Sequence, residues 1–496
     1  MALYQLSYDG SRSTVGAGDL LRLSLSGSTP FRLVPEYGPS MTDEDAVDAV
    51  LARARERVTP DDEERERLRA AASEVIDRAE AAAADLPVEA DVIQVGSTAR
   101  DTWLSGDRDI DVFVRFPPEL DRERLASYGL EVGHETLPDG REEFAEHPYV
   151  TGTVDGFDVD LVPCYRLDDA TEIRSAVDRT PFHTAYVEDR LDETLAGEVR
   201  IVKAFLSAIG AYGSDLRTRG ISGYLAELLT LEHGRARDLL ATAADEWQPP
   251  IEYDPETHAA ATFDDPLVVI DPTDPHRNVA AVVSPATVAR IQHYARELLD
   301  DPRDERLSPR KPDPIVPSVA RDVIDERGTT PVALRIPRPD VVDDQLYPQL
   351  ERSLDGITSA LDEHGFEPLR GIVLADDDVA ALLVECAIGE LSTIERHLGP
   401  PVHVRDHAER FAAAYDDDPT TYGPFVDEGR YVVERPRTHT TPEGFLRGDD
   451  LTSVALGVRI EEAIDRGDHD LLVGADVSTL ADRFGRDLAA YFDPVP

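Results

Sequence analysis

Apolar and polar residues alternate with two different periods along this chain, and these periods predict its helices and strands. Residues 61–85 (DDEERERLRAAASEVIDRAEAAAAD) are rich in strong helix formers and predict a long helix. A short apolar strand is expected in VIQV, followed by Gly-Ser and a helix start. Alternating positions in DIDVFVRF and GFDVDLVPCY predict two further strands. This order of elements indicates a mixed α/β unit.

The middle of the chain, from about residue 191 to residue 247, has a helical pattern. Apolar residues between Val199 and Ile209 recur on one stripe of a helix, and SGYLAELLTLEHG predicts a second helix. Lys203 falls roughly 100° from the centre of that stripe. We expect its stem to leave the core there for a cleft.

A segment dense in proline and charge marks a linker near residues 300–316. Beyond it, strand-like runs alternate with helical ones, which predicts a separate C-terminal α+β module. The strand-like runs are PVALRIPRP, GIVLADDDVAALLVECAI and RYVVERPR, and VDDQLYPQLERSLDGITSALDEHG is the clearest helical one.

The first forty residues are rich in Ser and Gly and show no sustained period. Met1 and Met41 are the only methionines, and a helical pattern with acids in its first turn begins after Thr42. Two interpretations stay open. Either translation starts at Met41, or residues 1–40 form an N-terminal arm.

Composition adds a strong charge bias to this picture. The chain has 496 residues, enough for roughly two to four domains, and 41% of them are apolar. Its formal net charge is −50, and 48 of its 50 basic residues are arginines; the two lysines are Lys203 and Lys311. An acidic, lysine-poor surface fits a cytosol of very high salt. At molar salt the Debye length is about 3 Å, so global acidity does not exclude a nucleic-acid partner.

The sequence disfavours several other classes of protein. Cys164 and Cys386 lie far apart and have no metal-ligand spacing, so no disulfide framework is expected. The chain lacks an apolar run of about 18 residues and a secretory leader pattern, so we expect a cytoplasmic protein. It also lacks a dinucleotide fingerprint and a GxxxxGK motif.

The strongest chemical signal is the pair Asp109 and Asp111. Residues i and i+2 of a strand face the same side, so both carboxylates point together. Such a pair repels itself unless a cation lies between them, and Mg²⁺ suits a phosphate substrate. A DxD pair alone is more often part of an ordinary surface strand.

Two further features strengthen the interpretation of Asp109 and Asp111 as part of a functional site. Gly96 and Ser97 end an apolar strand before a helix start, where backbone N–H groups and the hydroxyl can bind an oxyanion, and Arg100 follows one turn later. A third carboxylate is offered by GFDVDLVPCY, where Asp158 and Asp160 share a face. The pattern does not decide between these two. Three converging acids would suit a two-metal centre.

The run VGSTARDTWLSGDRDIDVFVRFP resembles the nucleotidyltransferase core of the DNA polymerase beta superfamily. More narrowly, the chain from about residue 42 to its end is similar to archaeal (class I) CCA-adding enzymes. The GS and DxD motifs are specific only to the superfamily, and the order of further segments selects the family. These segments are AEHPYVTG, GFDVDLVPCY, SAVDRTPFHTAYV, EVRIVKAFLSAIGAYG, RGISGYLAELL, VIDPTDPHRNVAAVVS and GPFVDEGRYVVERPR.

The resemblance implies roles for particular residues. Asp109, Asp111 and Asp160 take the metal-carboxylate positions, although the first is often Glu in the family. Other matched positions lie on the triphosphate side, at the base-reading position, and near the sugar and RNA. They are Ser97, Arg100, His183, Lys203 and Tyr212 for the triphosphate, Arg277 for the base, and Glu146 and His147 for the sugar and RNA.

The implied activity is the addition of C, C and A to the 3′ end of tRNA from CTP and ATP, by two-metal transfer without a nucleic-acid template. The alternatives are a poly(A)-type polymerase of the same superfamily and a non-catalytic RNA-binding protein. Mg²⁺ is the expected metal and the tRNA acceptor end is the expected partner. Whether the protein forms a homodimer is left open.

The resemblance also implies a division into parts. The fold class is α/β and α+β, with a polymerase-beta-like head that contains a mixed sheet. We expect an extension or misassigned start at 1–41, the catalytic domain at 42–185, a helical central domain at 186–312, and a C-terminal tRNA-binding region at 313–496.

Overall fold

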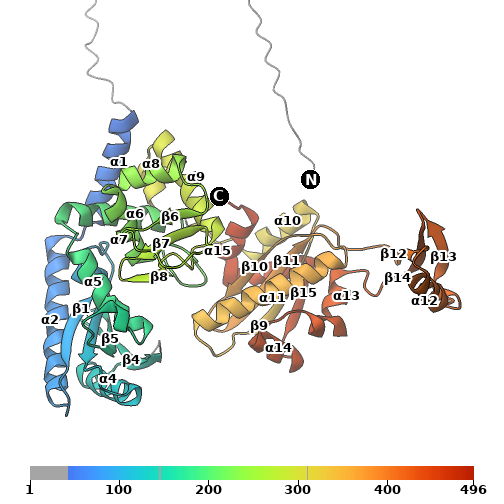
Figure 1. The fold of residues 1–496 in the computed structure, drawn as a ribbon. Coiled ribbons are helices and arrows are strands. Elements are labelled where there is room, and N and C mark those ends of the chain that lie inside the picture. Colours follow the sequence, from blue (N-terminus) through green and yellow to red (C-terminus); the bar gives the residue numbers. More distant parts are fainter. Residues whose placement is uncertain (1–42, 145–146, 310) are drawn as a thin grey trace, which may run out of the picture. The chain divides into compact units, whose positions relative to one another are not determined.

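A computed structural model describes residues 43–144, 147–309 and 311–496 (Figure 1). The question of a start at Met41 falls outside the described residues, as does Glu146. No described helix has both the length and the apolar character needed to span a membrane.

The first part of the described chain contains a five-stranded sheet in the order β1-β2-β5-β4-β3. β2 and β5 are parallel, and the other neighbours are antiparallel. The long helix predicted near residues 61–85 is confirmed as α2, and it packs with α4 on the sheet. The elements are α1 (Asp43–Val58), α2 (Asp62–Ala84), β1 (Asp91–Val95), α3 (Gly96–Ala99), β2 (Asp109–Phe116), α4 (Arg122–Thr136), β3 (Arg141–Phe144), β4 (Pro148–Val154) and β5 (Phe157–Tyr165).

The chain then passes through short 3₁₀ turns, η1 (Ala170–Glu172) and η2 (Ala176–Arg179), into a mainly helical part. A three-stranded sheet, β6-β7-β8, accompanies the predicted helices. The elements are α5 (Thr180–Glu188), α6 (Glu193–Ala208), α7 (Gly223–His233), α8 (Ala236–Asp245), β6 (Ile251–Tyr253), β7 (Leu267–Asp271), β8 (Asp274–Asn278), α9 (Pro285–Asp300) and η3 (Asp304–Leu307). α1 packs on α6, α8 and α9, and its buried face joins their core and not that of the first sheet.

One expectation about α6 is wrong. The pattern predicts that the stem of Lys203 leaves the core for a cleft, but every residue from Ala196 to Leu206 is buried. The reason is that α1, α7, α8 and η3 pack around the helix on several sides. The stem of Lys203 therefore stays in the core, and the side chain is only 1% exposed.

The last part is built on an antiparallel sheet in the order β10-β11-β9-β15, with α11 on one face and α10 and α15 toward the other (Figure 1). A second sheet, β12-β14-β13, carries α12. The elements are α10 (Pro317–Arg327), β9 (Thr330–Pro337), α11 (Asp343–Glu363), β10 (Pro368–Ala375), β11 (Val379–Cys386), β12 (Ile394–Pro401), α12 (Arg405–Tyr415), β13 (Tyr422–Asp427), β14 (Arg430–Pro436), α13 (Pro442–Leu446), η4 (Asp449–Ser453), α14 (Val458–Asp465), β15 (Asp470–Val473), η5 (Gly474–Leu480) and α15 (Ala481–Phe492).

Candidate active site

Neighbouring strands bring the predicted carboxylates together. Asp109 and Asp111 lie on β2, and the parallel register pairs Asp111 with Asp160 and Asp109 with Asp158 on β5. Adjacent strands lie about 4.8 Å apart, and residues two apart share a face, so all four acids line one face of the sheet. Asp158 is the exposed member of its pair and Asp160 is the more buried one. Burial therefore favours Asp160 as the third member of the site.

Asp109, Asp111 and Asp160, here called the carboxylate cluster, are like charges that repel one another. Burial raises the pKa of Asp111 to about 6, and the charges of Asp160 and Asp109 add to the effect. Burial likewise raises the pKa of Asp160 and, together with the charge of Asp158, that of Asp109. Like charges held close in a poorly solvated place favour a cation between them. The cluster thus has the donor set and the charge that a hard divalent ion requires.

Gly96 makes room for this cluster. β1 pairs with β2 so that Val95 faces Asp111, and Gly96 follows at the start of α3 with φ +80°. A Cβ atom built on Gly96 would lie 2.0 Å from Oδ2 of Asp111. Only glycine leaves space for the carboxylate here, and it also tolerates the positive φ. Gly96 therefore brings the start of α3, to which Ser97 belongs, close to the carboxylate of Asp111.

Arg100 and Lys203 converge on an acid that the sequence reasoning did not single out. Glu227 is fully buried, and it accepts hydrogen bonds from Nε of Arg100 at 3.1 Å and from Oγ1 of Thr102 at 2.5 Å. Nζ of Lys203 lies 3.8 Å from Glu227 and donates to the carbonyl and hydroxyl of Thr102 at 2.9 and 3.2 Å. We call Arg100, Thr102, Lys203 and Glu227 the Glu227 network.

In the Glu227 network two basic side chains share one buried acid, so one positive charge is left in excess. Burial lowers the pKa of Lys203 to about 8, against the opposing effect of Glu227. Arg100 also donates to Oγ1 of Thr184 at 2.9 Å, and its side chain is 7% exposed. Both cations are thus already paired in the described structure. A sequence signal for Glu227 did exist, since it is the one acid in the apolar run GYLAELLTL.

Tyr212 lies at the edge of this network. A Cβ atom on Gly223, the first residue of α7, would lie 3.2 Å from the hydroxyl oxygen of Tyr212 and 3.7 Å from Nζ of Lys203. Burial raises the pKa of the Tyr212 phenol, and Asp107, Glu227 and Asp109 add to this effect. The structure thus brings Tyr212 and Lys203 together, close to the acids of β2.

His183 and Arg277 meet at a second acid that sequence reasoning missed. Oδ2 of Asp271 is 2.9 Å from Nε2 of His183 and accepts a hydrogen bond from Nη1 of Arg277 at 2.7 Å. The ring of His183 stacks on Tyr224 with centroids 4.0 Å apart. Burial lowers the pKa of His183, with the hydrogen bond to Asp271 opposing. Asp271 ends the buried strand β7, and an acid at the end of an apolar run was the signal available.

The pKa of Asp271 lies below its ordinary value, although burial acts in the opposite direction. Hydrogen bonds and charge from His183, together with hydrogen bonds from Thr273, outweigh that burial. Asp271 is therefore a fixed negative charge that orients His183 and Arg277.

His147 is placed differently from the other matched residues. Its ring is 2% exposed and lies edge-on to Tyr165, with the centroids 6.4 Å apart. A buried ring fits a supporting position better than direct contact with RNA. Its suggested role near the sugar stays a prediction.

Models of known families match three consecutive parts of the chain. They describe a nucleotidyltransferase domain at residues 76–183, the second domain of tRNA nucleotidyltransferase at residues 197–307, and the C-terminal domain of CCA-adding enzyme at residues 327–474. A CCA-adding enzyme of Haloarcula marismortui is 56% identical over 466 residues, which cover 91% of this chain and all of that protein. The chain belongs to the CCA-adding enzymes.

Other CCA-adding enzymes are also similar. That of Halobacterium salinarum is 57% identical over 448 residues, covering 90% of this chain and 98% of the relative. That of Methanoregula boonei is 42% identical over 424 residues, covering 85% of this chain and 90% of the relative. The resemblance to archaeal CCA-adding enzymes is thereby confirmed, and so is the assignment of the chain as a tRNA nucleotidyltransferase.

Proposed function

We propose that this protein adds C, C and A to the 3′ end of tRNA, taking CMP from CTP twice and AMP from ATP once. Membership of the CCA-adding enzymes supports this activity. The observation that carries the chemistry is the carboxylate cluster, whose three acids lie on β2 and β5 with raised pKa values.

We assign Asp109, Asp111 and Asp160 as the residues that would hold two Mg²⁺ ions. Bound there, the ions would make the 3′-hydroxyl of tRNA more acidic and stabilise the pyrophosphate that leaves. The fit rests on the excess of negative charge in the cluster. The carboxylates must be ionised to act as ligands, and they fix the face of the sheet where the α-phosphate has to lie.

The remaining site residues position the nucleotide in this proposal. Ser97 belongs to the start of α3, which Gly96 brings close to the carboxylate of Asp111. Lys203, Arg100 and Tyr212 form the wall toward the triphosphate, and Glu227 fixes the two cations. Asp271 orients His183 and Arg277, and Arg277 offers the donors that can read the edge of C or A.

The C-terminal part, residues 313–496, is proposed to hold the tRNA acceptor stem by its shape and backbone, as duplex RNA generally requires. The division at residues 42, 186 and 313 is also a proposal, and the three matched family models support it in outline. The cytoplasmic location and the residue roles near RNA stay predictions, and whether the protein forms a homodimer is left open.

Nucleotide incorporation tests the proposal. A tRNA that lacks CCA should gain two C residues with CTP alone and the complete CCA with CTP and ATP. A tRNA that ends in CC should gain a single A. Asp111→Asn should remove all three additions, whereas Asp377→Asn, at an exposed acid of the β10–β11 turn, should not. Runs of A without C would overturn the proposal in favour of a poly(A)-type polymerase.

A further inference from the structure

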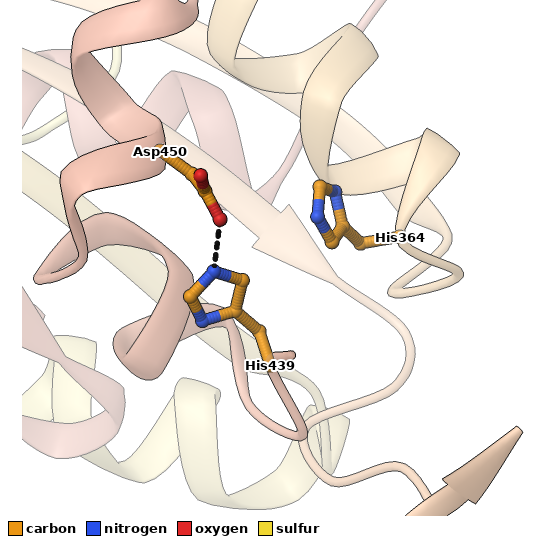
Figure 2. A group of neighbouring side chains, drawn as sticks. All are labelled: His364, His439 and Asp450. Carbon is orange, nitrogen blue, oxygen red and sulfur yellow. Dashed lines mark hydrogen bonds and ion pairs between the residues drawn. The ribbon is translucent and has the colours of Figure 1, made fainter. Parts of the chain in front are cut away.

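A histidine-rich cluster lies in the C-terminal part, away from the acids of β2 and β5. His364 follows the end of α11, His439 follows β14, and Asp450 lies in η4. One ligand atom from each lies within 4.8 Å of the other two, and no other group of this kind occurs among residues 43–144, 147–309 and 311–496. Figure 2 shows the three side chains pointing toward one space from three separate segments.

The hydrogen bonds already orient these rings for ligation. Nδ1 of His364 lies 2.8 Å from the carbonyl oxygen of Ala360. A carbonyl only accepts, so Nδ1 carries the proton and the neutral ring presents the lone pair of Nε2. Holding one ring nitrogen on a carbonyl is how proteins commonly orient a metal-binding histidine. Nε2 of His439 lies 2.7 Å from Oδ2 of Asp450 (Figure 2).

The surroundings keep the rings in place. Phe445 is 1% exposed, and its ring centroid lies 4.7 Å from that of His364 and 5.5 Å from that of His439. A Cβ atom on Gly448 would lie 2.9 Å from Cε1 of His439, so glycine there allows the close approach. Asp450 has a half-exposed side chain that can rotate. The cluster has apolar support on one side and access from solvent on the other.

We propose that His364, His439 and Asp450 form a binding site for a divalent transition-metal ion, with Zn²⁺ as the chemical class that fits best. Two imidazole nitrogens and one carboxylate are a zinc ligand set, and water completes the tetrahedron. Mg²⁺ and Ca²⁺ prefer oxygen ligands, so they fit this set poorly. The ion takes the place of the proton between His439 and Asp450. Ligand atoms around Zn²⁺ lie about 3.3 Å apart, so the side chains close inward on binding.

The position of the site indicates what it does. The segments that lead to β12 and away from β14 run side by side, because N–H of Leu391 donates to the carbonyl of Thr440 and N–H of Arg437 donates to that of Thr393, each at 2.8 Å. His439 belongs to this connection. A bound ion therefore fastens the base of the β12-β14-β13 module to the end of α11 and to η4.

Equilibrium dialysis of the full chain against Zn²⁺ tests the site. Saturating Mg²⁺ is kept present so that the carboxylate cluster does not take up the zinc. The wild type should bind about one Zn²⁺ per chain more than His364→Gln, His439→Gln or Asp450→Asn. His134→Gln is the matched control, because His134 pairs with Glu142 at 3.0 Å and no third ligand joins them among the residues that the structure describes. This variant should bind zinc as the wild type does. Equal zinc binding by the wild type and His364→Gln would overturn the proposal.

Two further readouts separate ligation from folding. Co²⁺ in the wild type should give the visible absorption of a tetrahedral ion, and Asp450→Asn should lose it while its far-ultraviolet circular dichroism is unchanged. Asp450 is exposed, so this variant does not depend on repacking the core. With saturating Mg²⁺ present, Zn²⁺ should raise the melting temperature of the wild type more than that of Asp450→Asn. An equal rise in both would overturn the fastening role.

Discussion

The carboxylate cluster and the Glu227 network lie in neighbouring parts of the chain, yet their charges are balanced in opposite ways. The cluster on β2 and β5 holds acids only, and burial raises the pKa of Asp111 to about 6. In the Glu227 network, one buried acid meets Arg100 and Lys203. The first arrangement costs stability until a cation arrives, whereas in the second each cation already contacts a carboxylate. The two regions therefore differ in whether a charged group already has a partner of opposite sign within the protein.

The sharpest test of this contrast is Asp111→Asn, which removes one charge at constant size. Nucleotide addition should fall by at least about 1,000-fold, equivalent to about 4 kcal/mol of transition-state stabilisation. The unfolding free energy of this variant, measured without divalent ions, should exceed that of the wild type. The folded pKa of Asp111 is raised, so its contribution to stability is present below the ordinary carboxyl pKa and is lost as the pH rises through about 6.

Incorporation assays and urea unfolding with chelator at pH 5 and pH 8 would measure both effects. The gain in stability should be larger at the higher pH. A loss of stability at pH 8 would contradict the view that the cluster is unbalanced.

Glu227→Gln should break the Glu227 network and cost about 3–5 kcal/mol of unfolding free energy. Arg100 and Lys203 would then lack their buried negative partner. Glu232→Gln is the control, because Glu232 lies on the same helix with an exposed side chain, and it should change stability by less than about 0.5 kcal/mol. Similar stability of the two variants would show that the network is not needed.

Gly96→Ala should reduce kcat/KM by about 100-fold, because a Cβ atom displaces the carboxylate of Asp111. Gly106→Ala is a matched control. Gly106 also has positive φ, at +92°, but a Cβ atom there meets nothing within 4 Å. Both variants should lose similar stability from the backbone, and only Gly96→Ala should lose activity. An equal loss of activity would assign the effect to backbone strain.

Lys203→Arg should cost about 1–3 kcal/mol of stability, because a larger head group has to fit where Lys203 is fully enclosed. Its nucleotide KM should also rise. Lys311→Arg is the natural comparison, since Lys311 is the only other lysine and is exposed in the linker. Denaturant unfolding and nucleotide titration of both variants check this. Unchanged stability and KM in Lys203→Arg would show that Lys203 is needed neither in the Glu227 network nor in the nucleotide site.

The elements near the site were largely predictable from local pattern. α2 and the strands β1, β2 and β5 follow the periods of residues 61–85, VIQV, DIDVFVRF and GFDVDLVPCY. Hydrophobic period reports which face of one element is buried, and this is a local property. The environment of α6 was not predictable in this way, because α1, which is distant in the sequence, packs on this helix together with α7.

The sequence by itself determined the strands β1, β2 and β5, the shared face of Asp109 and Asp111, and, through resemblance, the family. Only the tertiary structure decided that Asp160 is the more buried partner, that Glu227 and Asp271 fix the basic residues, and that His364, His439 and Asp450 meet. The physical reason is distance along the chain. Periodicity orients a side chain relative to its own element, whereas charge balance and metal ligation depend on groups that folding brings together from separate segments.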